Sequence, residues 1–257
     1  MELEGKTVVI TGGSRGMGQR LAVKLGREKA NVVVNFKKNA TAADDTVKEV
    51  LAAGGDAIAV QADIADPEAV GNLVNGTVER FGSIDVIVAN AAASAFKPLS
   101  EIHSKHIGLT MAITVDGFLE LTRAGVPHMP AGGRVMAISG WDSFRVLPGH
   151  GLLGAAKAAM ETIVKYLAIE LGPAGVTTVG VCPGPIDTDS FRTYAGERWD
   201  WYEKNWLAMT PSGRFPTPDE VADVMLLMCS PRSAAINGQT IVVDGGISLA
   251  TMPGPTA

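Results

Sequence analysis

The stretch that decides the fold is Thr11-Gly12-Gly13-Ser14-Arg15-Gly16-Met17-Gly18, which directly follows the apolar run Thr7 to Ile10. Glycines permit a tight turn and let backbone amides approach a pyrophosphate, whose negative charge is then met by the N-terminus of a following helix. A lone glycine pattern is weak evidence, but here strand, turn and helix stand in the order that such a phosphate site requires. The residues predicted to bind the phosphates of a dinucleotide are Gly12, Ser14, Arg15, Gly16, Met17 and Gly18.

Short β-branched runs alternate with longer helical patterns along the whole chain, which is typical of repeated βαβ units and a parallel sheet. Apolar residues recur at helical spacing in Val70 to Val78 and in Met160 to Leu171, and the second pattern ends at the helix stop Gly172-Pro173. The predicted fold class is α/β, a Rossmann-type doubly wound parallel sheet of about seven strands flanked by helices on both faces. The expected strands are Thr7–Ile10, Val32–Val34, Ala57–Gln61, Val86–Ala89, Val135–Ile138, Val176–Val181 and Thr240–Val243.

Length and composition indicate one domain. The chain has 257 residues, of which 46% are hydrophobic and 19% charged, which is enough apolar material for one large core. Internal repeats and low-complexity linkers are absent from the sequence, so the prediction is a single domain over residues 1–257. The stretch from Pro183 to Pro218 interrupts the strand-helix rhythm, and we expect it to supply a substrate lid at about 187–216, beyond the C-terminal edge of the sheet.

Charge, cysteines and the first residues argue against several functions. A net charge of −5 with scattered lysines and arginines offers no broad basic face, so nucleic acid is not an expected partner. Cys182 and Cys229 form no close-spaced pair and are expected to be buried thiols in a reducing compartment. The sequence shows neither a signal-peptide pattern nor an apolar run of about 20 residues, and its histidines lack metal-ligand spacing. We therefore expect a cytoplasmic protein with no membrane partner and no metal site.

The end of the second expected strand indicates which dinucleotide binds. An acidic residue about 20 positions beyond the glycine turn would bind a free ribose 2′-hydroxyl, whereas this chain reads Asn35-Phe36-Lys37-Lys38 and carries no carboxylate there. Lys37, Lys38 and Arg15 are instead placed to meet a 2′-phosphate. The alternative is that Lys37 and Lys38 are ordinary solvated loop residues. We expect this to be true of one of them. The sequence favours NADP(H) over NAD(H) as the cofactor.

Four further landmarks give the chain a family resemblance over almost its whole length. They are Ala62-Asp63-Ile64, Asn90-Ala91-Ala92, the segment from Pro183 to Thr188, and the segment from Gly238 to Gly246. Together with the glycine turn they resemble the short-chain dehydrogenase/reductase family, and they stand in its order. The resemblance implies a homotetramer or homodimer. It also implies cofactor contacts from Phe36, Asp63, Ile64, Asn90, Ala91, Ala92, Lys157, Pro183, Gly184, Ile186 and Thr188.

Three shorter stretches resemble one branch of that family more closely. They are Asn90 to Ser94, Lys165 to Leu171 and Thr210 to Arg214, and they look like the type III enoyl-acyl-carrier-protein reductases, as does Ile186 to Asp189. That branch reduces the double bond of an enoyl thioester with NADPH. The resemblance implies a small-molecule substrate such as a thioester or a carrier-bound acyl chain.

The resemblance fails at three of the four positions that the family uses for chemistry. The family needs a tyrosine that donates a proton, a lysine that lowers its pKa and binds the nicotinamide ribose, a serine, and usually an asparagine. Lys157 matches the lysine, but the tyrosine position four residues earlier holds Leu153. Gly140 stands at the serine position and Thr114 at the asparagine position. Because leucine cannot transfer a proton, ordinary ketone reduction is disfavoured.

A histidine stands where another proton donor is expected. Type III enoyl reductases place their tyrosine seven residues before the lysine, and this chain has His150 at that position. An imidazole titrates near neutral pH and can protonate an enolate or a carbonyl oxygen. The alternative is that His150, between Gly149 and Gly151, is a loop histidine exposed to water, and the sequence leaves both open. Ser139 and Ser143 are further catalytic candidates, and they lie with Asp142 on the loop after the fifth expected strand. Ser143 could orient a substrate oxygen and Asp142 could raise the pKa of a nearby imidazole, although each is more often a turn residue.

The expected lid is rich in aromatic residues. Trp199, Trp201, Tyr202, Trp206 and Met209 lie within eleven residues and offer an apolar wall for a planar or acyl substrate, although some of them will simply pack the lid on the body. We expect an NADP(H)-dependent oxidoreductase that reduces an enoyl thioester or a related conjugated carbonyl compound. Two alternatives remain: a non-redox dehydratase, isomerase or cyclase on the same fold, and a catalytically silent NADP(H)-binding protein.

Overall fold

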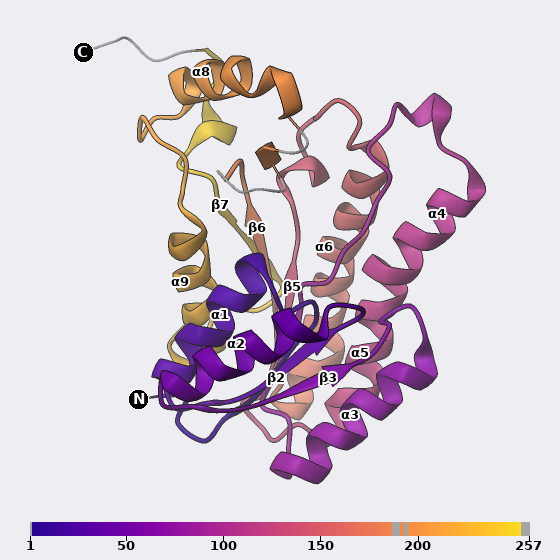
Figure 1. Cartoon of the computed structure of the whole chain (residues 1–257), viewed down its shortest axis with the longest axis vertical. Helices are drawn as coiled ribbons and strands as arrows, with labels where there is room; N and C mark the ends of the chain where they lie inside the picture. Colours follow the sequence, from indigo (N-terminus) through magenta and orange to yellow (C-terminus); the bar gives the residue numbers. More distant parts are fainter. Residues whose placement is uncertain (1, 187–190, 193–194, 253–257) are drawn as a thin grey trace.

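Seven parallel strands form the centre of the molecule. The computed structural model describes residues 2–186, 191–192 and 195–252, and its strands lie in the order β3-β2-β1-β4-β5-β6-β7 (Figure 1). Every pair of neighbouring strands is parallel, which confirms the predicted fold class. The strands are β1 Thr7–Ile10, β2 Asn31–Phe36, β3 Asp56–Gln61, β4 Val86–Ala89, β5 Arg134–Ile138, β6 Thr177–Pro183 and β7 Gln239–Val243.

Helices cover both faces of this sheet. One hydrophobic core joins the sheet to α1, α2 and α9, and a second core joins its other face to α3, α5 and α6, as the two sides of the ribbon in Figure 1 show. The α-helices are α1 Gly16–Arg27, α2 Ala40–Ala52, α3 Pro67–Phe81, α4 Ser104–Met111, α5 Gly117–Gly125, α6 Gly151–Leu171, α8 Trp199–Met209 and α9 Pro218–Cys229. The shorter helices are η1 Leu99–Glu101, η2 Ala112–Asp116, η3 Val126–His128, η4 Trp141–Ser143, η5 Gly172–Ala174, η6 Gly196–Arg198, η7 Pro231–Ser233 and η8 Ile247–Leu249.

The strand order reverses between β1 and β4, and this reversal places the site. The chain moves outward from β1 to β2 and β3, then returns to pair β4 with the other side of β1. A crevice opens at the carboxyl ends of the strands at such a switch point, because the connections on its two sides lead to opposite faces. The glycine turn after β1 and the Asn90 segment after β4 therefore lie at the same edge of the sheet.

The predicted strands are correct in place and differ only at their ends. Strand β2 extends on both sides of the predicted Val32–Val34 to Asn31–Phe36. A polar residue at position 35 ends the apolar run in the sequence, yet the Asn35 side chain is buried and donates hydrogen bonds to the carbonyl oxygens of Val60 and Ala62. A buried amide with partners fits a strand interior as well as an apolar side chain does.

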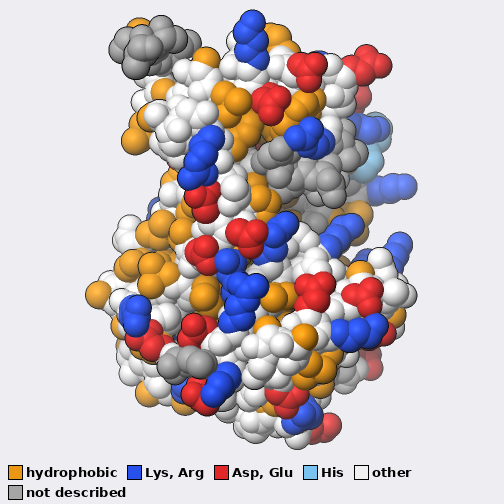
Figure 2. Space-filling model, turned by 60° about the vertical axis from the view of Figure 1, so that its left-hand side comes forward, with side chains coloured by type: hydrophobic (Ala, Val, Ile, Leu, Met, Phe, Trp, Pro, Cys, Tyr) orange, Lys and Arg blue, Asp and Glu red, His pale blue; other side chains and the backbone are white. Residues whose placement is uncertain are grey.

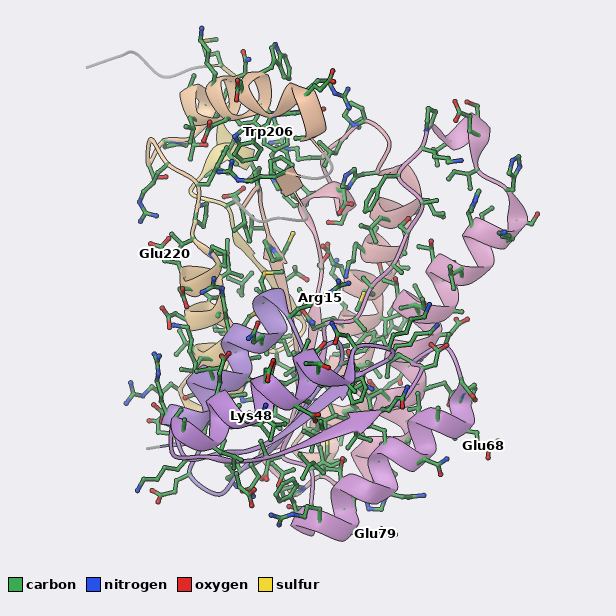
Figure 3. All side chains as sticks on the ribbon, viewed as in Figure 1. Arg15, Lys48, Glu68, Glu79, Trp206 and Glu220 are labelled. Atoms are coloured by element: carbon green, nitrogen blue, oxygen red, sulfur yellow. The ribbon has the colours of Figure 1, made fainter. Side chains whose placement is uncertain are left out.

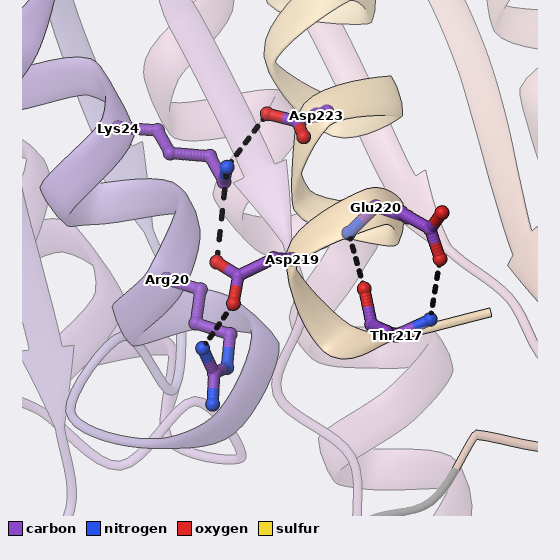
Figure 4. Close-up of polar contacts among 6 residues, drawn as sticks. All are labelled: Arg20, Lys24, Thr217, Asp219, Glu220 and Asp223. Atoms are coloured by element: carbon purple, nitrogen blue, oxygen red, sulfur yellow. Dashed lines mark hydrogen bonds and ion pairs between the residues drawn. The ribbon is translucent and has the colours of Figure 1, made fainter.

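Helix α9 is fixed on α1 by ion pairs and by its own first turn (Figure 4). Arg20 and Lys24 of α1 lie 2.6 Å from Asp219 and Asp223 of α9, respectively. At the start of α9, the Thr217 hydroxyl accepts a hydrogen bond from the amide of Glu220, whose carboxylate accepts one from the amide of Thr217. This reciprocal capping satisfies two backbone donors that a helix terminus otherwise leaves unpaired.

The predicted lid is only partly described. Residues 187–190 and 193–194 fall outside the described ranges, and the rest of the stretch contains η6 and α8. Figure 1 shows α8 beyond the carboxyl ends of β6 and β7, which is where the lid was expected.

The molecular surface and the cysteines follow the sequence pattern. On the face shown in Figure 2, basic and acidic side chains are intermingled. Within the described ranges, no helix is long and apolar enough to cross a membrane, and no group of three His, Cys, Asp or Glu side chains has the geometry of a metal site. Cys182 and Cys229 are buried free thiols, and burial raises the pKa of each to about 12. Both thiols are therefore protonated and unreactive near neutral pH.

Candidate active site

The glycine turn has the geometry of a phosphate cradle. Gly12 has a φ of +62°, and its amide donates a hydrogen bond to the side chain of Asn35 at 3.3 Å. A Cβ on Gly18 would lie 2.8 Å from the carbonyl oxygen of Gly12 and 2.9 Å from Nδ2 of Asn90. Any side chain at Gly18 would therefore push the helix away from the turn, so glycine is required there for close packing.

The first turn of α1 leaves its amides available for an anion. Arg15 precedes the helix without a side-chain capping bond, and the first turn contains no acidic residue. Unpaired amides at a helix N-terminus attract phosphate groups. Ser14 is partly buried, and Arg15 is exposed at this end of α1 (Figure 3). The turn thus fits the diphosphate of a dinucleotide by its own structure.

Hydrogen bonds tie the segment after β4 to the turn. Nδ2 of Asn90 donates to the carbonyl oxygens of Thr11 and Gly12 at 2.9 and 3.2 Å. The Thr11 hydroxyl accepts hydrogen bonds from the amides of Asn90 and Ala91. The Asn90-Ala91-Ala92 segment therefore forms one wall of the same crevice, with Ala92 exposed.

The predicted 2′-phosphate residues gather at the ends of β2 and β3. Phe36 is buried, whereas Lys37 and Lys38 are exposed. Nζ of Lys37 lies 2.5 Å from the carboxylate of Asp63, which follows β3. Partial burial alone would raise the pKa of Asp63, but the hydrogen bonds from Lys37 and from the amide of Ala65 lower it. The ion pair with Asp63 thus positions Lys37, whereas Lys38 has no ion pair among the described residues.

The remaining expected cofactor contacts are distributed around this edge. Ile64 is buried against Gly117 of α5, where a Cβ would approach the Ile64 side chain to 2.3 Å. Pro183 ends β6, Gly184 packs against Asp244, and Ile186 is buried. Thr188, the residue expected to contact the nicotinamide carboxamide, lies outside the described residues.

Lys157 is buried at the centre of the site. Its side chain is directed to the end of β5, where Nζ donates a hydrogen bond of 2.5 Å to the carbonyl oxygen of Ile138. Burial lowers the pKa of Lys157 to about 8, and the nearby Asp142, Cys182 and Glu161 oppose the shift. A buried ammonium with one carbonyl partner is poised to bind additional hydroxyl oxygens, such as those of a ribose.

His150 is paired with a carboxylate and is not an isolated loop residue. Its Nδ1 lies 3.1 Å from Oδ2 of Asp142, and the two side chains are 13% and 7% exposed. The ring of Phe96 covers it, with centroids 4.6 Å apart. The backbone of His150 precedes α6, the helix that also carries Lys157. The structure therefore brings His150 and Lys157 to the first part of one helix, and it places Asp142, the carboxylate expected near an imidazole, against His150.

One altered family position, Gly140, lies directly against Asp142. A Cβ on Gly140, which stands at the usual serine position, would lie 2.6 Å from Oδ1 of Asp142. A Cβ on Gly154 would lie 2.3 Å from the carbonyl oxygen of the same aspartate. Leu153, at the usual tyrosine position, is partly buried on α6. Gly140 thus leaves room for the Asp142 carboxylate, and Gly154 leaves room for the backbone of the same residue.

The two serines predicted for catalysis are held by a residue that sequence analysis missed. The hydroxyls of Ser139 and Ser143 both donate to Oε1 of Glu161, at 2.5 and 2.7 Å. Glu161 lies four residues after Lys157 and therefore on the same face of α6. That spacing was the one available signal, but a glutamate in a long helix is more often an exposed residue.

Two further polar groups near the site lack partners. The Thr114 hydroxyl is buried in the π-helical turn η2 and makes no hydrogen bond within the described ranges. Nε1 of Trp141, directly after Gly140, is likewise buried and unpaired in the part of the chain that the structure describes. Such buried polar atoms are rare in folded proteins, and they commonly mark a water or ligand position.

A pocket of about 670 Å³ opens between the segment after β5 and the helices η6 and α8. Its walls are mainly aromatic and apolar. The edge of Trp141 meets Trp206 of α8, with centroids 5.6 Å apart, and Trp206 in turn contacts Tyr202 at 5.0 Å. Figure 3 shows Trp206 pointing from α8 toward the body of the molecule. The residues that line the pocket are Trp141, Val146, Leu147, Pro148, Glu197, Arg198, Trp201, Tyr202 and Trp206.

Comparison with known proteins agrees with this geometry. A family model described as enoyl-(acyl carrier protein) reductase matches residues 12–248. The 1-cyclohexenylcarbonyl-CoA reductase of Streptomyces collinus is 39% identical over 95% of this chain and 88% of its own length. Versicolorin reductase stcU of Emericella nidulans is 34% identical over 95% of this chain and 96% of its own. A solved short-chain dehydrogenase from Burkholderia cenocepacia in complex with NADP has a TM-score of 0.89 and 32% identity, covering 96% of this chain and all of that one.

Proposed function

Because the chain belongs to the short-chain dehydrogenase/reductase family of oxidoreductases, we propose that it uses NADP(H) to reduce the carbon–carbon double bond of an enoyl thioester or a related conjugated carbonyl compound. The observation that carries the proposal is the pair formed by Asp142 of η4 and His150, the residue that directly precedes α6, the helix that carries the buried Lys157. It supplies an acid at a site that lacks the usual tyrosine.

The cofactor fits the crevice at the switch point of the sheet. The glycine turn and the first amides of α1 hold the diphosphate, and Lys37, Lys38 and Arg15 meet the 2′-phosphate. Lys157 binds the nicotinamide ribose through its ammonium group. When bound, NADPH supplies a hydride to the substrate. A relative of known structure binds NADP, which supports this choice of cofactor.

His150 acts as the proton donor, and Asp142 positions it. The contact between Nδ1 and the carboxylate of Asp142 fixes the orientation of the ring. Nε2 is then the atom that delivers a proton to the substrate, either directly or through a water molecule. Ser139 and Ser143 lie on the segment that also carries Asp142, and their hydrogen bonds to Glu161 hold this segment against α6. These contacts preserve the shape of the site.

The altered site suits a conjugated double bond better than an isolated ketone. Reduction at the β-carbon of a conjugated thioester places negative charge on an enolate, which hydrogen-bond donors or solvent can quench. Such a reaction depends less on one strong, tightly positioned acid than ketone reduction does. The Streptomyces relative is named as a reductase of a cyclic enoyl-CoA, which supports the same chemistry.

The pocket under the lid receives the acyl group. Aromatic side chains from Trp141 and α8 present flat apolar surfaces to a ring or a short chain. Arg198 at the same pocket offers a positive charge to the phosphates of coenzyme A or of a carrier arm. The substrate is thus a small acyl group on a phosphate-bearing thioester.

We also propose that the chain forms a homotetramer or homodimer. Tyr166 and Ile169 on α6 are 68% and 79% exposed, which leaves large apolar side chains unpacked on a long helix. Light scattering coupled to size exclusion measures the mass directly, and a monomeric mass would contradict the proposal.

Cofactor binding is the first test. Calorimetric titration should show micromolar binding of NADPH and much weaker binding of NADH. If neither dinucleotide binds, the oxidoreductase and the silent NADP(H)-binding protein are both excluded, and a non-redox enzyme remains. If NADPH binds, its oxidation should be followed with 1-cyclohexenylcarbonyl-CoA, with crotonyl-CoA and with a panel of ketones. Oxidation by the enoyl thioesters supports the proposal, and a complete lack of turnover favours the silent protein.

The proton donor is tested with His150→Gln, and exposed His128→Gln serves as the control. His150→Gln should lower kcat for the enoyl thioester by about a hundredfold with little change in the Kd of NADPH. His128→Gln should leave both values unchanged. Unaltered turnover in His150→Gln would show that another group or water donates the proton.

A further inference from the structure

The carbonyl oxygen of the proposed substrate needs a hydrogen-bond donor, and the serine that normally serves is replaced by Gly140. The two nearest serines cannot take over without a rearrangement. A hydroxyl has a single hydrogen, and those of Ser139 and Ser143 are both directed at Oε1 of Glu161. While these bonds persist, neither serine has a hydrogen left for a substrate oxygen.

Trp141 provides an uncommitted donor beside them. It follows Gly140 directly, and its Nε1 is buried and unpaired among the described residues. The indole N–H can only donate, so it cannot be satisfied as an acceptor. A buried donor without a partner is costly and therefore rare in folded proteins. An oxygen atom of a ligand bound in the pocket could accept the missing hydrogen bond.

Trp141 borders the pocket proposed for the substrate. The side chain lines the 670 Å³ pocket proposed for the acyl group. Its ring is held by an edge-on contact with Trp206 at an interplanar angle of 63°, and Trp206 is itself held by Tyr202. The next residue, Asp142, anchors His150. One short segment therefore carries a fixed donor and positions the proposed acid.

We propose that Nε1–H of Trp141 donates a hydrogen bond to the carbonyl oxygen of the thioester, in the role that a serine hydroxyl has in the family. This inference rests on the proposed function. As the double bond is reduced, negative charge moves onto this oxygen, so the hydrogen bond strengthens in the transition state. An indole stays neutral over the working pH range, so the donor acts independently of the protonation state of His150.

A pair of ligands that differ in one oxygen tests the contact without turnover. Cyclohexanecarbonyl-CoA is a thioester, and S-(cyclohexylmethyl)-CoA is the matching thioether without the carbonyl oxygen. Their Kd values are measured by calorimetry in the presence of NADP⁺ for the wild type and for Trp141→Phe, which keeps an aromatic ring and removes the N–H. Trp206→Phe is the matched control, because it alters a ring of the same pocket.

Trp141→Phe should raise the Kd of the thioester roughly fivefold to tenfold and leave the Kd of the thioether unchanged. Trp206→Phe should change both ligands by the same factor. Trp141→His, which restores a ring N–H, should recover part of the preference for the thioester. An unaltered Kd of NADP⁺ shows that each variant is folded.

Two results would overturn the inference. If Trp141→Phe weakens both ligands equally or affects neither, Trp141 contributes only ring packing while the proposed function stands. If the wild type binds NADP⁺ but neither CoA compound, the thioester part of the proposed function fails, and the role of Trp141 fails with it.

Discussion

Gly140 and the carboxylate of Asp142 are so close that a side chain at position 140 would make the carboxylate shift. A Cβ at position 140 would lie 2.6 Å from Oδ1 of Asp142, nearer than real Cβ contacts come. The same carboxylate holds Nδ1 of His150 at 3.1 Å. The absence of the usual serine and the presence of a histidine-carboxylate pair are therefore two aspects of one rearrangement of the loop after β5.

Restoring the family's serine should consequently damage the site. Gly140→Ser would push the Asp142 carboxylate away from His150, and we expect at least a tenfold loss of kcat with an NADPH Kd within about twofold of the wild type. Gly71→Ser is the control, because a Cβ there meets nothing within 4 Å. Steady-state assays with the enoyl thioester measure the effect. A Gly140→Ser enzyme with undiminished kcat would show that the Asp142 position does not matter.

Asp142→Asn should show whether the carboxylate is needed to position His150. Asparagine preserves the size of the side chain but replaces one of the two carboxylate oxygens, so we expect kcat to fall tenfold or more with a smaller change in KM. A crystal structure of the variant would verify that the ring has not moved. If His150 donates no proton, Asp142→Asn and His150→Gln would both have wild-type kcat.

Lys157 should make the free energy of unfolding of the apoprotein change with pH in the alkaline range. Burial lowers its pKa from 10.5 to about 8, so between these values the unfolded chain binds more protons than the folded one. The free energy of unfolding contributed by this group therefore rises with pH between about 8 and 10.5, and the penalty of burying the charge is fully present below about pH 8.

Lys157→Met removes that contribution. The variant should be more stable than the wild type near pH 7, and the difference should shrink as pH approaches 10.5. Urea denaturation of both proteins across this range measures the difference, and other titrating groups, such as the buried cysteines, largely cancel in it. A difference that does not vary with pH would contradict the assigned titration.

The two lysines after β2 should select the cofactor. Charge-assisted hydrogen bonds to a phosphate are strong. The double variant Lys37→Ala/Lys38→Ala should therefore raise the Kd of NADPH roughly tenfold to a hundredfold and leave the Kd of NADH nearly unchanged. Lys48→Ala is the control, because this exposed lysine on α2 is paired with Asp45 (Figure 3). Calorimetric Kd values for both dinucleotides decide the matter. An equal loss for NADPH and NADH would place the lysines away from the 2′-phosphate.

The capping of α9 gives a prediction for stability alone. Thr217→Ala removes the hydroxyl that accepts from the amide of Glu220, and we expect a loss of about 1 kcal/mol in the free energy of unfolding. Thr217→Ser should retain most of it, because serine caps equally well. Urea denaturation measures the change. A Thr217→Ala protein as stable as the wild type would show that the cap is replaced by solvent.

The fold was predictable because its signals are local. The glycine turn after β1 and the β-branched runs lie in adjacent residues, and the structure confirms each predicted strand with shifts at the ends only. Asn35 shows the limit of such reasoning. In the sequence it ends an apolar run, whereas in the structure its amide is satisfied by the turn on one side and by β3 on the other. Partners that belong to other strands are invisible to a local pattern.

The candidate site was predictable only in part for the same reason. Lys157 and His150 were found through their spacing in a family pattern, and the structure brings both to α6. Glu161 and Trp141 carried no such pattern, because their roles depend on hydroxyls and rings contributed by other segments. The carboxylate that binds two serines, and the indole without an acceptor, become visible only once the chain is folded.

The aromatic contact between Trp141 and Trp206 has a practical consequence. The chain contains four tryptophans, and all of them, Trp141, Trp199, Trp201 and Trp206, lie in the loop after β5 or in α8. Tryptophan fluorescence, excited at wavelengths where tyrosine does not absorb, therefore originates entirely from the loop after β5 and from α8, the two segments that line most of the candidate pocket. The protein contains its own optical reporter: quenching by an acyl ligand, or energy transfer to a bound reduced nicotinamide, would record occupancy of the site without a label.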